Sequence, residues 1–230
     1  DIASFTATNA SNAPVVATIT VTPGYTNAGT TCTGTPRTFT ITVNPTPTVD
    51  PVANQAVCNN APTTAVNFTG FVPGTVYNWT NSDPSIGLAA SGTGNIASFT
   101  ATNPGTAPVT ATITVTPSYT NAGTTCTGTP ITFDITVNPT GQVNQPASQV
   151  VCNNTPTAPV NFTTTVPGTV FDWVNNTPSI GLAASGTGNI ASFTATNATN
   201  APVVATVTVT PSYVSSVSGT QTFNFTGGIQ

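Results

Sequence analysis

The side chains that could carry out chemistry are few in this sequence. Its 230 residues include five acidic residues, one basic residue and no histidine. The acidic residues are all aspartates and are widely separated along the chain: Asp1, Asp50, Asp83, Asp134 and Asp172. Proton-transfer catalysis needs titratable groups held within hydrogen-bonding distance of the reacting atoms, and a calcium site needs several carboxylates. The composition therefore argues against both kinds of site.

Repeats within the chain strengthen this argument. Residues 84–119 recur at 178–213 with only five substitutions. The aspartate that precedes the first copy, Asp83, is replaced by Thr177 before the second. A catalytic or metal site built into each repeat would keep its carboxylates from one copy to the next. We therefore expect no enzyme activity, no cofactor and no bound metal.

Four cysteines permit three pairings: Cys32, Cys58, Cys126 and Cys152. In a chain without lysine they favour an oxidising, extracellular environment. One possibility is a disulfide between Cys58 and Cys126, which would join the start of a repeat to its last hairpin loop; we expect these at the same end of the fold. In the alternative, the disulfides Cys32–Cys58 and Cys126–Cys152 would link neighbouring repeats. The sequence leaves both open.

Two tryptophans at equivalent positions, Trp79 and Trp173, allow two interpretations. Exposed, they could stack against sugars, so an array of carbohydrate-binding modules is the alternative function. Buried, each would fill the core of a β-sandwich, as a large aromatic on the third strand usually does. We favour the core, with Phe68, Phe99 and Phe133 packed around Trp79. Exposure of both indoles would be required for the carbohydrate alternative.

Charge and hydropathy exclude two classes of partner. The net charge of −4 with a single arginine gives no basic patch for nucleic acid or anionic lipid. No apolar run approaches the roughly 18 residues that span a bilayer, so we expect no membrane insertion. Threonine rows such as Thr112–Thr116 could bind ice if they formed a flat lattice, but strands in a sandwich are twisted.

The structural elements that position these residues recur along the chain with a long period. Ile2, Ile96 and Ile190 are equivalent, and both intervals are 94 residues. This period is too long for a solenoid repeat and matches a small independent domain. The predicted units are a partial module at 1–45, a complete module at 46–139 and a complete last module with a shortened final loop at 140–230. The sequence thus begins inside a module, and this half module is expected to be partly disordered or completed by another chain because its apolar face and strand edges are open.

Period-two alternation predicts strands, as in Ala111–Thr116, where alanine, isoleucine and valine alternate with threonine. Within the complete module, seven short strands are expected: Ala56–Cys58, Val66–Phe68, Val76–Trp79, Ile86–Ala89, Ile96–Ala101, Ala111–Thr116 and Ile131–Val137. Ser91–Asn95 reads as a hairpin turn. The proline-containing segments 43–51 and 137–146 read as semi-rigid linkers that place modules end to end. The pattern predicts an all-β fold of tandem immunoglobulin-like β-sandwich modules.

The repeat text also carries a family resemblance. It runs Val-Cys-Asn-Asn, Val-Asn-Phe-Thr, Tyr-Asn-Trp-Thr-Asn, Ile-Gly-Leu-Ala-Ala-Ser-Gly-Thr-Gly-Asn-Ile, Ala-Thr-Ile-Thr-Val-Thr-Pro and Phe-Asp-Ile-Thr-Val-Asn-Pro. This text resembles the PKD-like, immunoglobulin-like repeats of giant cell-surface adhesins of Bacteroidota that serve gliding motility. The resemblance implies stalk repeats of an extracellular filament on the Gram-negative outer surface, exported by type IX secretion. Its partners would be neighbouring repeats, the gliding machinery, and the substratum or a polysaccharide. No catalytic or binding residue transfers with it.

Overall fold

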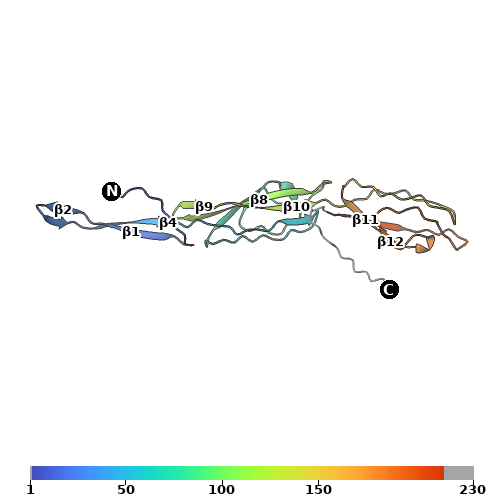
Figure 1. Cartoon of the computed structure of the whole chain (residues 1–230), viewed down its shortest axis with the longest axis horizontal. Coiled ribbons are helices and arrows are strands. Elements are labelled where there is room, and N and C mark those ends of the chain that lie inside the picture. The colour runs from blue at the N-terminus through green and yellow to red at the C-terminus, as the bar shows by residue number, and fades with distance from the viewer. Residues whose placement is uncertain (1, 215–230) are drawn as a thin grey trace, which may run out of the picture. The chain divides into compact units, whose positions relative to one another are not determined.

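The computed structural model describes residues 2–214 (Figure 1). The chain is nearly all β and contains several sheets, which is consistent with a β-sandwich. The strands are β1 (Val15–Val21), β2 (Gly24–Asn27), β3 (Thr30–Thr33), β4 (Arg37–Val43), β5 (Gln55–Cys58), β6 (Val76–Asn81), β7 (Ser91–Thr93), β8 (Val109–Asn121), β9 (Thr124–Thr127), β10 (Ile131–Asn138), β11 (Thr169–Asn175), β12 (Ser185–Thr187) and β13 (Val207–Tyr213). Two 3₁₀ turns complete the list: η1 (Pro84–Ile86) and η2 (Pro178–Ile180).

The chain forms two compact units, and their division does not follow the predicted module boundaries. One unit comprises residues 1–57, 61–101 and 110–136, and the other comprises 58–60, 102–109 and 137–230. The shortened final loop predicted for the last module lies almost wholly outside the described residues.

The N-terminal 43 residues contribute two antiparallel strand pairs. Strand β1 pairs with β4 from Val15 opposite Val43 to Val21 opposite Arg37, and β2 pairs with β3 as a hairpin. In the two-stranded sheet that β1 and β4 form, each strand has one hydrogen-bonding edge open. The half module therefore contains four strands.

The largest sheet follows the order β5-β10-β8-β6-β7, with β9 added beside β8. Strand β8 is the longest, at 13 residues, and pairs with β6 so that Trp79 lies opposite Val115. A smaller sheet repeats part of this arrangement 94 residues later, in the order β12-β11-β13, with Trp173 opposite Val209. The equivalent strands of the two repeats thus have the same register around each tryptophan.

Three predicted strands are wrong or reduced. Ile86 belongs to η1 and not to a strand, because Pro84 starts the turn, the Asp83 side chain caps it and Gly87 ends it with a left-handed φ of 96°. The expected strands at 66–68 and 96–101 contribute only isolated bridges, one of which pairs Val66 with Ile96. The predicted hairpin turn at Ser91–Asn95 is instead strand β7 followed by Gly94 at φ 76°.

The predicted linkers are not spacers, since each is packed into a folded unit. In the first, Pro45, Pro47 and Val49 are buried while the residues between them are exposed, which is the period of a strand. The amide of Asp50 donates to the Thr69 carbonyl at 2.8 Å. The second segment makes the equivalent bond, from the amide of Asn144 to the Thr163 carbonyl at 2.8 Å. These segments are the first extended elements of the packed structure.

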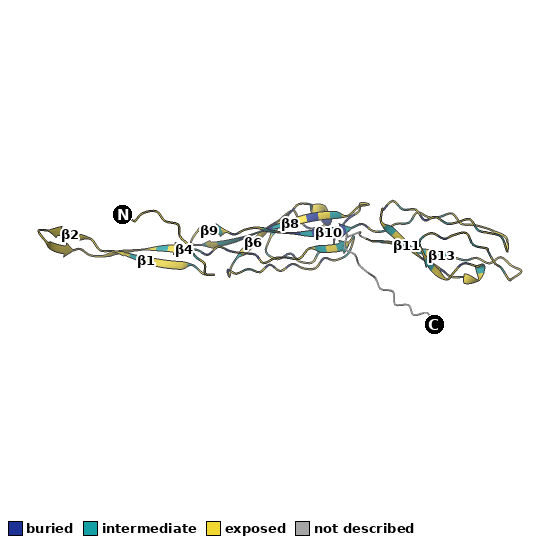
Figure 2. Cartoon of the chain, in the orientation of Figure 1, coloured by how far each residue is buried: buried dark blue, intermediate teal, exposed yellow. Residues whose placement is uncertain are grey.

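Burial follows the alternation that the sequence predicted. Inward-facing residues of β8 and β10 are fully buried in the first unit, whereas their threonine neighbours are partly or fully exposed (Figure 2). The opposing core residues come from outside the regular strands: Val49, Val66, Phe68, Val72, Ile86, Leu88 and Ile96. In the second unit a smaller cluster is built from Phe162, Trp173, Leu182 and Ile190.

Candidate functional site

Three aspartates accept hydrogen bonds from nearby threonine or serine residues. Asp50 accepts a hydrogen bond from the Thr69 hydroxyl at 2.6 Å. Asp134 accepts one from the Thr112 hydroxyl at 2.8 Å. Asp83 accepts hydrogen bonds from Ser85 at the start of η1, and these bonds lower the pKa of the Asp83 carboxyl. No group of three or more potential metal-ligating side chains occurs within residues 2–214.

Both tryptophans lie in the core. Trp79 is 8% exposed and Trp173 is 7% exposed. The carbohydrate alternative needed two exposed indoles, so this basis for it is wrong. Phe68 and Phe133 are buried as expected, with ring centroids 6.5 Å apart, whereas Phe99 is only partly buried.

A glycine on the neighbouring strand leaves room for each indole, a role that sequence reasoning missed. A Cβ atom on Gly92 would lie 2.2 Å from Cζ2 of Trp79, and one on Gly186 would lie 2.2 Å from Cζ2 of Trp173. The Trp79 indole N–H donates to the Gly94 carbonyl at 3.2 Å. The glycines of the repeated Ser-Gly-Thr-Gly text therefore make room for the ring as well as a turn.

The four cysteines are free thiols in this structure, so neither predicted pairing is formed. Cys126 lies opposite Tyr119 in the β8–β9 hairpin. The residue after Cys58, Asn59, donates its amide hydrogen to the carbonyl of Asn138 at the end of β10. Cys58 thus lies on a strand beside β10, whereas the hairpin that carries Cys126 is bonded to the chain just before the module, through Asn121 and Asn44.

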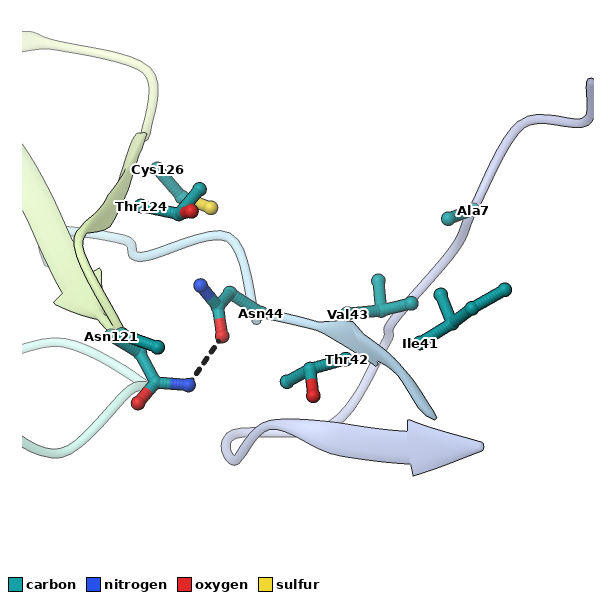
Figure 3. Close-up of a pocket in the computed structure, with 9 residues that line it drawn as sticks. Ala7, Ile41, Thr42, Val43, Asn44, Asn121, Thr124 and Cys126 are labelled. Atoms are coloured by element: carbon teal, nitrogen blue, oxygen red, sulfur yellow. Dashed lines mark hydrogen bonds between the residues drawn. The ribbon is translucent and has the colours of Figure 1, made fainter. Parts of the chain in front are cut away.

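An open groove lies beside the half module (Figure 3). Its volume is about 360 Å³. Ala7, Ile41 and Val43 line it from the half module, and Cys126 and its hairpin neighbours line it from the other side. A hydrogen bond of 2.8 Å from Asn121 Nδ2 to Asn44 Oδ1 connects the two sides. The groove is largely apolar and contains no titratable pair.

The apolar residues of this groove are core residues in the complete module. Ile41 and Val43 correspond to Ile135 and Val137, which are 1% and 0% exposed. In the half module both are partly exposed. The surface is therefore an uncovered core face, which we call the open face: the inward-facing residues of β1 and β4, namely Ala17, Ile19, Val21, Phe39, Ile41 and Val43.

In every repeat the side chain of one asparagine hydrogen-bonds to the loop that follows it, an arrangement that we call the asparagine clasp. Sequence reasoning did not predict it. Asn103 donates from Nδ2 to the carbonyls of Ala107 at 2.9 Å and Val137 at 2.7 Å. Asn9 makes the corresponding bonds to Ala13 and Val43, each at 2.8 Å. In the last repeat, Asn197 Nδ2 donates to Ala201 at 2.9 Å. Retention of this asparagine in all three copies was the available signal.

Comparison of the sequence with protein-family models and with curated proteins finds no match. The class defined by the structure is an all-β protein whose packing repeats along the chain. Across residues 2–214, no helix has the length and apolar character needed to cross a membrane.

Proposed function

We propose that the chain is a structural array of tandem immunoglobulin-like β-sandwich modules from a secreted, filamentous cell-surface adhesin that serves gliding motility and surface attachment. The observation that carries this proposal is the repetition of the same buried contacts from one module to the next. Asn81 and Asn175 illustrate it. Each is buried and donates from Nδ2 to the carbonyl of a leucine seven residues later, at 2.9 and 3.0 Å.

The proposed role is mechanical. A load applied along the chain would be carried by the hydrogen-bonded ladders of β8 and β10 in the complete module and of β11 and β13 in the last. The segments 43–51 and 137–146 are packed into the folded structure. An applied force would therefore act on the folded modules without first extending a free linker. The partners in this proposal are neighbouring repeats, the gliding machinery and the substratum, and the location is the outer cell surface.

Single-molecule pulling of the whole chain tests the mechanical role. A released module of 94 residues lengthens the chain by about 320 Å, at about 3.4 Å per residue, less its folded length. We expect two similar steps of this size. In a Trp173→Ala variant, one step should be lost or shifted to lower force while the other is unchanged. One cooperative event for the whole chain would contradict an array of modules.

The cellular role needs a separate experiment. An antibody raised against the chain is expected to label intact source cells and to stop their gliding. Labelling only after the cells are broken open would contradict a surface location. Binding of the purified chain to a panel of polysaccharides would instead favour a carbohydrate-binding array that uses a surface other than the two tryptophans.

A further inference from the structure

Cys126 lies where one repeat meets the repeat before it. It lines the groove beside the half module together with Val43 and Asn44 (Figure 3). Asn44 directly follows β4, the last strand of the half module, and its side chain is bonded to Asn121 of the β8–β9 hairpin at 2.8 Å. The hairpin of the complete module therefore contacts the end of the preceding repeat, and it carries its cysteine to that end.

The other cysteine position lies at the equivalent end of the complete module. Cys58 ends β5, which pairs with β10, and its side chain is exposed. The amide of the next residue, Asn59, donates to the carbonyl of Asn138 at the end of β10, at 2.8 Å. The carbonyl of Ala61 accepts a bond from the Ala101 amide at 2.9 Å. The segment that begins at Cys58 is thus held at the end of the module by these two contacts.

A shift of one repeat, 94 residues, maps these contacts onto the lining of the groove. Asn138 and Ala101, which hold the segment, correspond to Asn44 and Ala7. Both Asn44 and Ala7 line the groove. When a repeat with its β5 cysteine precedes the hairpin, the segment after that cysteine therefore lies in this groove, beside Cys126.

We propose, on the basis of the tandem array proposed above, that disulfides cross the junctions between repeats. The cysteine at the position of Cys58 in one repeat pairs with the cysteine at the position of Cys126 in the next. The thiolate of one cysteine attacks a disulfide oxidant and releases one reduced thiol, and the second thiolate then attacks the mixed disulfide and releases the other. Two cysteine thiols are oxidised and one oxidant disulfide is reduced. The bond joins adjacent modules of the stalk covalently.

Strand length and hairpin direction distinguish this pairing from the pairings within reach of the sequence alone. Cys126 precedes β10, whereas Cys58 lies beside its far end at Asn138. The eight residues of β10 span about 25 Å, whereas the Cα atoms of a disulfide lie about 4.4–6.8 Å apart. The pairs Cys32–Cys58 and Cys126–Cys152 would join a hairpin to the repeat that follows it. The structure places the hairpin beside the repeat that precedes it.

The test lengthens the array by one repeat, because the sequence has no cysteine after Cys152 and so supplies no hairpin partner for Cys58. A second copy of residues 46–139 is inserted after residue 139 of the full chain, and serine replaces all cysteines except two. The test protein keeps Cys58 in the first copy and Cys126 in the second. The matched control keeps Cys58 and Cys126 in the first copy. Both proteins are treated with oxidised glutathione, a small-molecule disulfide, and free thiols and intact mass are measured.

We expect the test protein to lose both thiols to an internal disulfide while it remains a monomer, and the control to form no internal disulfide. In single-molecule pulling, oxidation of the test protein should shorten the released length by about 540 Å, the extended length of the roughly 160 residues that the bond encloses. The inference is overturned if the test pair forms no internal disulfide, or if the control pair forms one equally well. It would fail together with the proposed function if the reduced protein unfolded in a single event; module-sized steps in the reduced protein without an internal disulfide would overturn the inference alone.

Discussion

Substitution of Gly92 by alanine tests how the core is built. The added Cβ would lie 2.2 Å from Cζ2 of Trp79, far inside van der Waals contact. The indole is rigid, buried and held by its hydrogen bond to the Gly94 carbonyl at 3.2 Å, so it cannot rotate away without losing packing. Overpacking costs about 1–3 kcal/mol and loss of the hydrogen bond about 1 kcal/mol. We therefore expect Gly92→Ala to destabilise the complete module by about 2–4 kcal/mol.

Urea denaturation followed by tryptophan fluorescence measures this loss. A Trp173→Phe background leaves Trp79 as the single fluorescent indole. With an m-value of about 1–1.5 kcal/mol per molar for a domain of this size, the unfolding midpoint should fall by roughly 2 M. A change below about 0.5 kcal/mol, the range of a neutral surface substitution, would refute the packing argument.

Two further variants separate the clash from backbone strain. Gly94 has a left-handed φ of 76° and no atom within 4 Å of an added Cβ, so Gly94→Ala should cost only about 1–2 kcal/mol, from its conformation. Replacing Trp79 by leucine removes the indole ring with which the added Cβ at position 92 would clash. The Gly92→Ala/Trp79→Leu double variant should therefore lose less free energy of unfolding than the sum of the losses of the two single variants.

Three other predictions follow from single contacts. Asn81→Ala removes the donor to the Leu88 carbonyl and should destabilise the module by about 1–3 kcal/mol in urea denaturation, and an unchanged midpoint would contradict a structural role for this amide. The Asp83 carboxyl has a pKa below its ordinary 3.8, so its stabilisation is present above that pH and is lost as the pH falls through the lowered value. Wild type should therefore be more stable than Asp83→Asn near neutral pH and equal to it in strong acid; a stability difference that does not change with pH would exclude this linkage. Thiol titration of the denatured chain, prepared without reductant, should give four free thiols, whereas two or none would indicate that disulfides form in the protein.

The aspartates and cysteines show where sequence reasoning reached its limit. Separation along the chain led to the expectation that the aspartates form no common site. It could not indicate that Asp83 caps η1, because a cap depends on the backbone turn that Pro84 and Gly87 produce. For the cysteines, the module's entry does lie beside its last hairpin, since Pro47 lies close to Gly128. The position of Cys58 could not be predicted, because it depends on the pairing of β5 with the distant strand β10.

The sequence by itself determined the period of 94 residues, the alternation of Ala111–Thr116, and the burial of both tryptophans, since each is a local pattern of apolar and polar residues. Only the tertiary structure decided that Pro45, Pro47 and Val49 are buried, because the segments that contact this stretch are distant in the sequence: Asp50 bonds to Thr69, and Pro47 lies close to Gly128. The same holds for Gly92, whose missing side chain matters only once a ring lies against it. Properties that depend on one stretch of chain could be predicted, whereas those that depend on contact between two stretches required the fold.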